Sequence, residues 1–167
     1  MNEDSETNGN TDLDVRIVKL EPMRVAWALG FGTEPEQQAW DKLLPWAREN
    51  GLLETGEEHL LYGFNNPNPS PGSPNYGYEV WIKVGPEVAS DDPEIRFKDV
   101  PAALYAVTRC DVPKGDFDVI GRKWQQLVAW REQSAYRCAE HQCLEESLLD
   151  AAPELEFALD LMLPIAE

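Results

Sequence analysis

The run W-x-x-L-x-x-W occurs twice in this chain of 167 residues, and no other feature limits the possible folds as strongly. The two copies consist of Trp40, Leu43, Trp46, Trp124, Leu127 and Trp130. Residues three and six positions apart lie on one face of a helix, so each copy predicts the apolar stripe of an amphipathic helix. Because such a stripe usually packs on a core, we expect these tryptophans to be structural.

The segments around the two stripes also repeat in the same order. Strand patterns at 15–29 and 95–108 precede helix patterns at 34–50 and 117–134. Two further strands follow each helix, at 59–64 and 76–84 in the first half and at 141–149 and 158–165 in the second. Chance would rarely reproduce both the stripes and their flanks, so the sequence predicts a doubled unit. The order in each half is strand-strand-helix-strand-strand, or β-α-β-β if the breaks at Pro22 and Pro101 are only bends.

Neither repeat is long enough to bury its own strands and helix fully, which favours pairing of the two. We predict one α+β domain over residues 14–167, with repeat one at 14–85 and repeat two at 94–167. In this fold two pseudo-twofold-related β-α-β-β repeats form an antiparallel sheet backed by two helices, with a central ligand cleft. Residues 1–13 are polar and acidic, and we expect them to be a disordered lead.

The ends of the helices are suggested by their flanking residues. Thr33 is a candidate N-cap for the first helix, with Pro35 near its first turn and Gly51 at its C-terminal end. Pro45 lies inside this helix, where it removes a backbone donor, so we expect a kink or a restart there. Gly115 or Asp116 is expected to precede the second helix.

The charge balance limits the classes of partner. Acidic residues outnumber basic ones by 31 to 14, which gives a net charge of -17. Proteins that bind nucleic acid neutralise its phosphates with Lys and Arg, so direct nucleic-acid binding is not expected. The acidity can serve solubility alone, or it can attract cations.

The same composition argues for a cytoplasmic protein without a membrane segment. No apolar run approaches the roughly 18 residues of a membrane span, and the first residues lack a signal-peptide pattern. The three cysteines include no C-x-x-C pair, so we expect them to be reduced core or strand residues.

Glu79 lies in a strand pattern whose two faces differ in character. Alternation places Glu79, Trp81 and Lys83 on one face of residues 76–84. The other face is apolar and is predicted to pack against the helices; its members are Tyr78, Val80, Ile82 and Val84. An acid and a tryptophan then share a face that meets solvent or a cleft.

A second acidic strand gives two candidates, between which the pattern does not decide. Glu145 and Ser147 share one face of their strand, whereas Glu146 shares the other with leucines. A carboxylate among aromatic rings can hold a cation, and burial of that carboxyl would suit a general acid or base. The alternative is that each glutamate is an ordinary solvated residue.

Aromatic residues in strands are the better candidates for a ligand cleft. Trp27 and Trp81 have this position, as do Tyr62, Phe64 and Tyr105. His59 and His141 begin matching strands but lack a third ligand at a metal-binding spacing, so no metal site is expected. No complete catalytic constellation or phosphate-binding loop is present, so catalytic residues stay unassigned and no cofactor is predicted.

Four segments resemble the GyrI-like, AraC-type effector-binding domain, a two-repeat fold that senses small molecules. VRIVKLEP at 15–22 resembles the first strand of the family, and IRFKDVPAALYAV at 95–107 resembles the opening of its second repeat. IGRKWQQLVAW at 120–130 resembles its second helix, and LDLMLPI at 159–165 resembles its closing strand. The order and spacing of these segments carry the resemblance.

The resemblance implies a cleft lined by aromatic residues, with a buried carboxylate that binds lipophilic cations. Glu145 is the residue that best fits the family's acidic position, and Ser147 stands where many members carry an aromatic residue. With no helix-turn-helix expected, the resemblance implies a stand-alone domain. We expect it to bind a small lipophilic molecule that can carry a positive charge.

Two alternatives follow from the same resemblance. The domain could be a hydrolase of strained electrophilic compounds that uses a buried glutamate. It could also be an acidic protein-interaction module, for example an inhibitor of a topoisomerase, in which case a protein is its partner.

Overall fold

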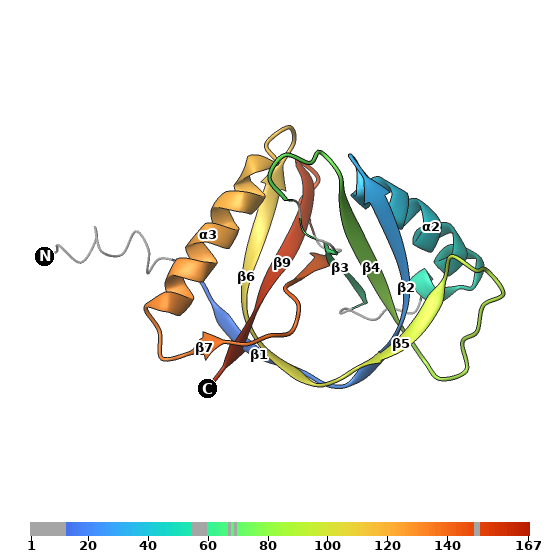
Figure 1. Cartoon of the computed structure of the whole chain (residues 1–167), viewed down its shortest axis with the longest axis horizontal. Coiled ribbons are helices and arrows are strands. Elements are labelled where there is room, and N and C mark those ends of the chain that lie inside the picture. Colours follow the sequence, from blue (N-terminus) through green and yellow to red (C-terminus); the bar gives the residue numbers. More distant parts are fainter. Residues whose placement is uncertain (1–12, 55–59, 67, 69, 149–150) are drawn as a thin grey trace, which may run out of the picture. The chain divides into compact units, whose positions relative to one another are not determined.

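The computed structural model describes residues 13–54, 60–66, 68, 70–148 and 151–167 (Figure 1). The predicted disordered lead therefore lies outside the described residues, except for Leu13. The chain forms two compact units, each with an antiparallel sheet and one long helix. Unit 1 comprises Met1–Leu20 and Ala103–Glu167, and unit 2 comprises Glu21–Ala102. This composition confirms the predicted α+β class.

Unit 2 is a four-stranded antiparallel sheet covered on one face by a helix. In chain order its elements are β2 (Met23–Gly32), α2 (Pro35–Glu49), the short 3-10 helix η1 (Leu52–Glu54), β3 (Leu61–Asn65), β4 (Tyr76–Val84) and β5 (Arg96–Val100). The strand order across the sheet is β3-β4-β2-β5. The strand predicted at 76–84 is confirmed residue for residue, because its aromatic and β-branched run is unbroken.

The apolar stripe of α2 forms the core of unit 2. Leu43 is fully buried and Trp46 nearly so, and both belong to a cluster that includes Val80 and Ile82 of β4. This arrangement confirms both the helical stripe and the apolar face predicted for the strand. Trp40 is partly buried against the same cluster.

The N-terminal end of α2 differs from expectation, and the helix does not restart at Pro45, while the expected kink stays a prediction. The N-cap is Glu34 rather than Thr33, and no side chain caps the helix there. Pro45 lies within a helix assigned without interruption. Its side chain is exposed, so the ring points away from the core that the helix covers. Gly51 has a positive φ of 69°, as expected for the residue that follows a helix.

Unit 1 has the same layers. Its elements are β1 (Arg16–Leu20), β6 (Ala103–Pro113), α3 (Asp118–Glu132), the two-residue β7 (Arg137–Cys138), β8 (Leu144–Leu148) and β9 (Leu155–Ala166). The sheet runs β1-β6-β9-β8, and β7 pairs with the end of β9. Leu127 of α3 is fully buried, and Trp124 and Trp130 are partly buried against the same core. The cap expected at Gly115 or Asp116 is wrong, because Phe117 holds that position.

The compact units do not coincide with the sequence repeats, because the first strand of each repeat pairs in the other unit. β1 belongs to repeat one but pairs with β6, and β5 belongs to repeat two but pairs with β2. The ligand cleft expected between the repeats stays a prediction. Among the described residues no helix is long and apolar enough to cross a membrane.

Candidate functional site

The side of the unit 2 sheet opposite α2 gathers most of the predicted ligand-binding residues. In the register of β4, Trp81 lies directly across from Trp27 of β2 and from Tyr62 of β3. Glu79 lies across from Phe64 in the same way. Residues opposite each other on paired strands share a face, so one tight group forms from three strands.

Glu79 is the centre of this group. Its side chain is only 2% exposed. The amide of Asn66 donates a hydrogen bond of 2.9 Å to Oε1, and the indole N–H of Trp81 donates one of 2.7 Å to Oε2. The ammonium of Lys98 forms an ion pair with the same Oε2. Both carboxylate oxygens therefore have partners, as a buried acid requires.

Aromatic rings surround the ion pair. The Lys98 ammonium lies 4.8 Å from the ring centroid of Trp27 and 5.1 Å from that of Trp81, within range of a cation–π attraction. The ring centroids of Phe64 and Tyr62 lie 5.3 Å and 6.3 Å from the ring centroid of Trp81. We call this group the Glu79 cluster; it consists of Glu79, Trp81, Trp27, Tyr62, Phe64, Asn66 and Lys98.

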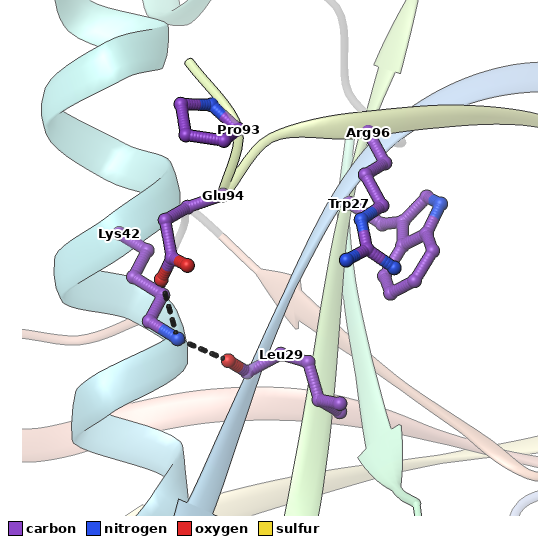
Figure 2. Close-up of a pocket in the computed structure, with 6 residues that line it drawn as sticks. All are labelled: Trp27, Leu29, Lys42, Pro93, Glu94 and Arg96. Atoms are coloured by element: carbon purple, nitrogen blue, oxygen red, sulfur yellow. Dashed lines mark hydrogen bonds and ion pairs between the residues drawn. The ribbon is translucent and has the colours of Figure 1, made fainter.

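A pocket of about 160 Å³ adjoins the Glu79 cluster through Trp27. Its lining residues are Trp27, Leu29, Lys42, Pro93, Glu94 and Arg96. As Figure 2 shows, Lys42 of α2 reaches both the carbonyl oxygen of Leu29, at 2.7 Å, and the carboxylate of Glu94, at 2.8 Å. The guanidinium of Arg96 lies 5.4 Å from the Trp27 ring centroid. The pocket thus joins the Trp27 and Leu29 side chains to three charged residues, and its volume is below the roughly 300 Å³ at which ligand pockets usually begin.

Glu145 lies in unit 1, on the side of the sheet that faces the helix. It pairs with the buried Leu161 of β9, and its carboxylate accepts a hydrogen bond of 3.1 Å from the indole N–H of Trp124 in α3. Ser147 shares this face and is partly buried. These two predicted site residues therefore belong to the helix-packed layer of unit 1, whereas the Glu79 cluster belongs to unit 2.

Glu146 shares the opposite face with a buried acid that the sequence reasoning did not single out. Glu146 is 3% exposed and pairs directly with Asp160, which is 4% exposed. One oxygen of Asp160 accepts a hydrogen bond of 2.7 Å from Arg16, while the buried Oδ1 has no hydrogen-bond partner. The alternation of charged and apolar residues in β9 was a signal that could have identified Asp160.

Tyr105, the last of the predicted residues, is also buried on this second face. Its hydroxyl donates a hydrogen bond of 2.9 Å to the carbonyl oxygen of Gln142, and its ring forms a T-shaped pair with the ring of His141, with centroids 5.1 Å apart. Burial raises the pKa of Tyr105 above its ordinary value, so the hydroxyl stays protonated at neutral pH. Tyr105 is therefore a hydrogen-bond donor in this face.

Two members of the Glu79 cluster were missed from the sequence. Lys98 was assigned to the strand that opens repeat two, and only the pairing of β5 with β2 brings it to Glu79. Asn66 lies in the proline-rich segment 65–75, to which the sequence analysis assigned no site residue. Its position directly after β3 was the available signal.

The described residues contain no group of three His, Cys, Asp or Glu side chains that could hold a metal ion. His59 lies outside the described residues. His141 contacts the Tyr105 ring and lies 3.3 Å from the carbonyl oxygen of Leu104.

Curated relatives share a quarter of the sequence over most of its length. A DNA gyrase inhibitor from Pectobacterium carotovorum is 27% identical over 143 residues, which cover 84% of this chain and 90% of that protein. A DNA gyrase inhibitor from Erwinia billingiae is 26% identical over 164 residues, covering 93% and 99%.

Solved structures share the fold at lower identity. A hydrolase from Listeria innocua has a TM-score of 0.66 at 14% identity and covers 92% of each chain. SAV2435 bound to tetraphenylphosphonium has a TM-score of 0.56 at 10% identity, covering 92% of this chain and 94% of that one. EcmrR in its DNA complex has a TM-score of 0.67 at 11% identity, and the present chain spans 63% of its length.

The family model for the GyrI-like small molecule binding domain matches residues 13–166. This span includes all of unit 2, most of unit 1 and every residue of the Glu79 cluster. The chain therefore belongs to the family of GyrI-like small-molecule binding domains.

Proposed function

We propose that the Glu79 cluster binds a small lipophilic molecule that can carry a positive charge. The observation that carries this proposal is a carboxylate, 2% exposed, that already holds a cation between two tryptophan rings. A site that holds an ammonium in this way has the chemistry to hold the cationic group of a ligand. The pocket beside Trp27 offers room for an attached apolar group.

Each part of the cluster has a separate role in this proposal. Asn66 and the Trp81 indole fix the orientation of the Glu79 carboxylate, so little reorganisation is needed on binding. The faces of Trp27 and Trp81 attract a cation and also contact apolar groups. Family membership supports small-molecule binding in general, and the solved SAV2435 complex supports a lipophilic cation as the first probe.

The proposal is tested by titrating the protein with tetraphenylphosphonium and following tryptophan fluorescence. Glu79→Gln removes the central charge and should weaken binding about tenfold or more, because a contact with a charged group contributes roughly 1.5–3 kcal/mol. Glu145→Gln makes the same change in the helix-packed layer of unit 1 and should leave affinity within about twofold.

The reverse pattern would contradict the proposal. If Glu145→Gln abolishes binding while Glu79→Gln leaves it unchanged, the ligand depends on the carboxylate first favoured by the family resemblance. Full affinity in both variants would show that neither charge is required.

A second candidate function, inhibition of DNA gyrase, is favoured by the two relatives described as DNA gyrase inhibitors. The net charge of -17 is compatible with docking on a basic protein surface. Purified gyrase should then supercoil relaxed plasmid more slowly as the protein is added at physiological salt. Unchanged supercoiling at a large molar excess would rule out this function.

A further inference from the structure

Lys98 occupies the position that the proposed function gives to the ligand. Its ammonium contacts the Glu79 carboxylate and the rings of Trp27 and Trp81. Glu79 is 2% exposed and Trp81 1% exposed, so a cation reaches them only by taking the place of this ammonium. We propose that Lys98 is a specificity-determining residue, an internal cation that a positively charged ligand must displace. This inference rests on the proposed function, since it concerns the same site.

The Lys98 side chain is suited to leaving, whereas Glu79 is not. The Lys98 side chain is 38% exposed and the Glu79 side chain is 2% exposed. Lys98 comes from β5, which pairs with β2 along only five residues and leaves its other edge clear of unit 2 strands. An ammonium on a flexible four-carbon stem recovers strong hydration when it moves into water. Displacement therefore moves Lys98 while the carboxylate and both tryptophans keep their positions.

The ion pair also determines which ligand charge the site prefers. With Lys98 in place, the Glu79 carboxylate is neutralised, so a neutral aromatic ligand can contact the partly exposed Trp27 ring without breaking the pair. A cationic ligand meets like charge unless Lys98 withdraws. The wild-type site thus binds cations with little apolar surface weakly. It accepts cations whose apolar contacts offset the loss of the Glu79–Lys98 ion pair.

Removal of the Lys98 ammonium should make the site prefer a cationic ligand over a neutral one. We expect Lys98→Met to tighten binding of tetraphenylphosphonium about tenfold or more. In this variant the ligand no longer has to break the ion pair and the ring contacts of Lys98, whose loss weakens wild-type binding by roughly that factor. Binding of the neutral triphenylphosphine oxide should change by less than about threefold. Lys98→Arg keeps the charge and should bind both probes much as the wild type does.

A matched control separates this local effect from net charge. Lys114→Met makes the same charge change at an exposed turn residue of unit 1 and should leave both affinities unchanged. The gain from Lys98→Met should also be lost when Glu79→Gln is present, because the cation then has no carboxylate to bind. Calorimetric titration measures all of these affinities.

The outcomes distinguish the two proposals. If tetraphenylphosphonium binds neither the wild type nor Lys98→Met, the proposed function fails and the inference fails with it. If Glu79→Gln weakens binding but Lys98→Met leaves it unchanged or weaker, the proposed function stands and the role of Lys98 is refuted.

A measurement on the wild-type protein gives an independent test that needs no folded variant. Acylation of lysines by an amine-reactive ester, followed by mass spectrometry of peptides, reports how accessible each ammonium is. Saturating tetraphenylphosphonium should increase acylation of Lys98 relative to Lys114. Unchanged or reduced acylation of Lys98 under saturation would overturn the displacement.

Discussion

The Glu79–Lys98 pair gives an asymmetric prediction for stability, because the two charges are buried to very different degrees. The Lys98 side chain can turn into water when its partner is removed, since it is 38% exposed. Glu79, at 2%, has no such alternative. Lys98→Met should therefore destabilise the protein more than Glu79→Gln does, although both remove the same ion pair.

The loss in the free energy of unfolding depends on which group each variant leaves without its ion-pair partner. Removing one partner of a fully buried pair costs roughly 3–5 kcal/mol, and the exposure of Lys98 reduces our expectation for Lys98→Met to about 2 kcal/mol. The hydrogen bonds from Asn66 and Trp81 limit that loss further. In Glu79→Gln the amide of Asn66 can rotate to accept from the new side chain, so about 1 kcal/mol is expected. The double variant should cost about 1 kcal/mol less than the sum of the single variants.

Urea unfolding at 25 °C, followed by far-ultraviolet circular dichroism, measures these differences as shifts in midpoint at constant slope. Tryptophan fluorescence is unsuitable as the main signal because the variants alter the surroundings of Trp27 and Trp81. An equal or smaller loss for Lys98→Met than for Glu79→Gln would refute the argument, since Glu79 would then reach water in the folded protein.

Three further predictions concern the packing of each unit and the ionisation of one buried tyrosine. Leu43→Ala and Leu127→Ala should each lower the free energy of unfolding by about 3 kcal/mol in urea titrations, since both leucines are fully buried. Gly63→Ala should cost about 1–3 kcal/mol in the same assay, because an added Cβ would lie 2.4 Å from the Tyr78 hydroxyl oxygen. The raised pKa of Tyr105 means that the unfolded chain releases this proton first, so stability should fall above about pH 10, and Tyr105→Phe should flatten that fall.

The elements of the fold were predictable because their patterns are local. The period of W-x-x-L-x-x-W identified both helices to within two residues, and alternation identified the faces of β4. The cap at Thr33 failed for a different reason. Threonine is a residue type that favours the N-cap position, but the helix begins one residue later than Thr33 would cap, so Glu34 is the N-cap.

The candidate site was predictable only in part, because its chemistry depends on strand pairing. Glu79 and Trp81 are two residues apart in one strand, so alternation alone places them on the same face. Lys98 reaches them through the pairing of β5 with β2, in which its own partner is Val25, 73 residues earlier in the sequence. A repeat-based reading assigns that strand to the other half, so no local pattern could have supplied the counter-ion of Glu79.

The net charge of the protein predicts attraction of a cationic ligand, whereas the neutralised Glu79–Lys98 pair predicts none. Which effect dominates depends on the distance between the ligand and the charges. A charge of -17 attracts cations from solution, but at physiological ionic strength this field decays over about 8 Å. A bound ligand responds instead to the nearest groups, which here are one carboxylate and the ammonium already paired with it. Rising salt should therefore slow the association of a cation while having a smaller effect on its dissociation. Our proposal therefore predicts that the affinity of the site depends on competition between the ligand and Lys98 for Glu79, and not on the acidity of the protein as a whole.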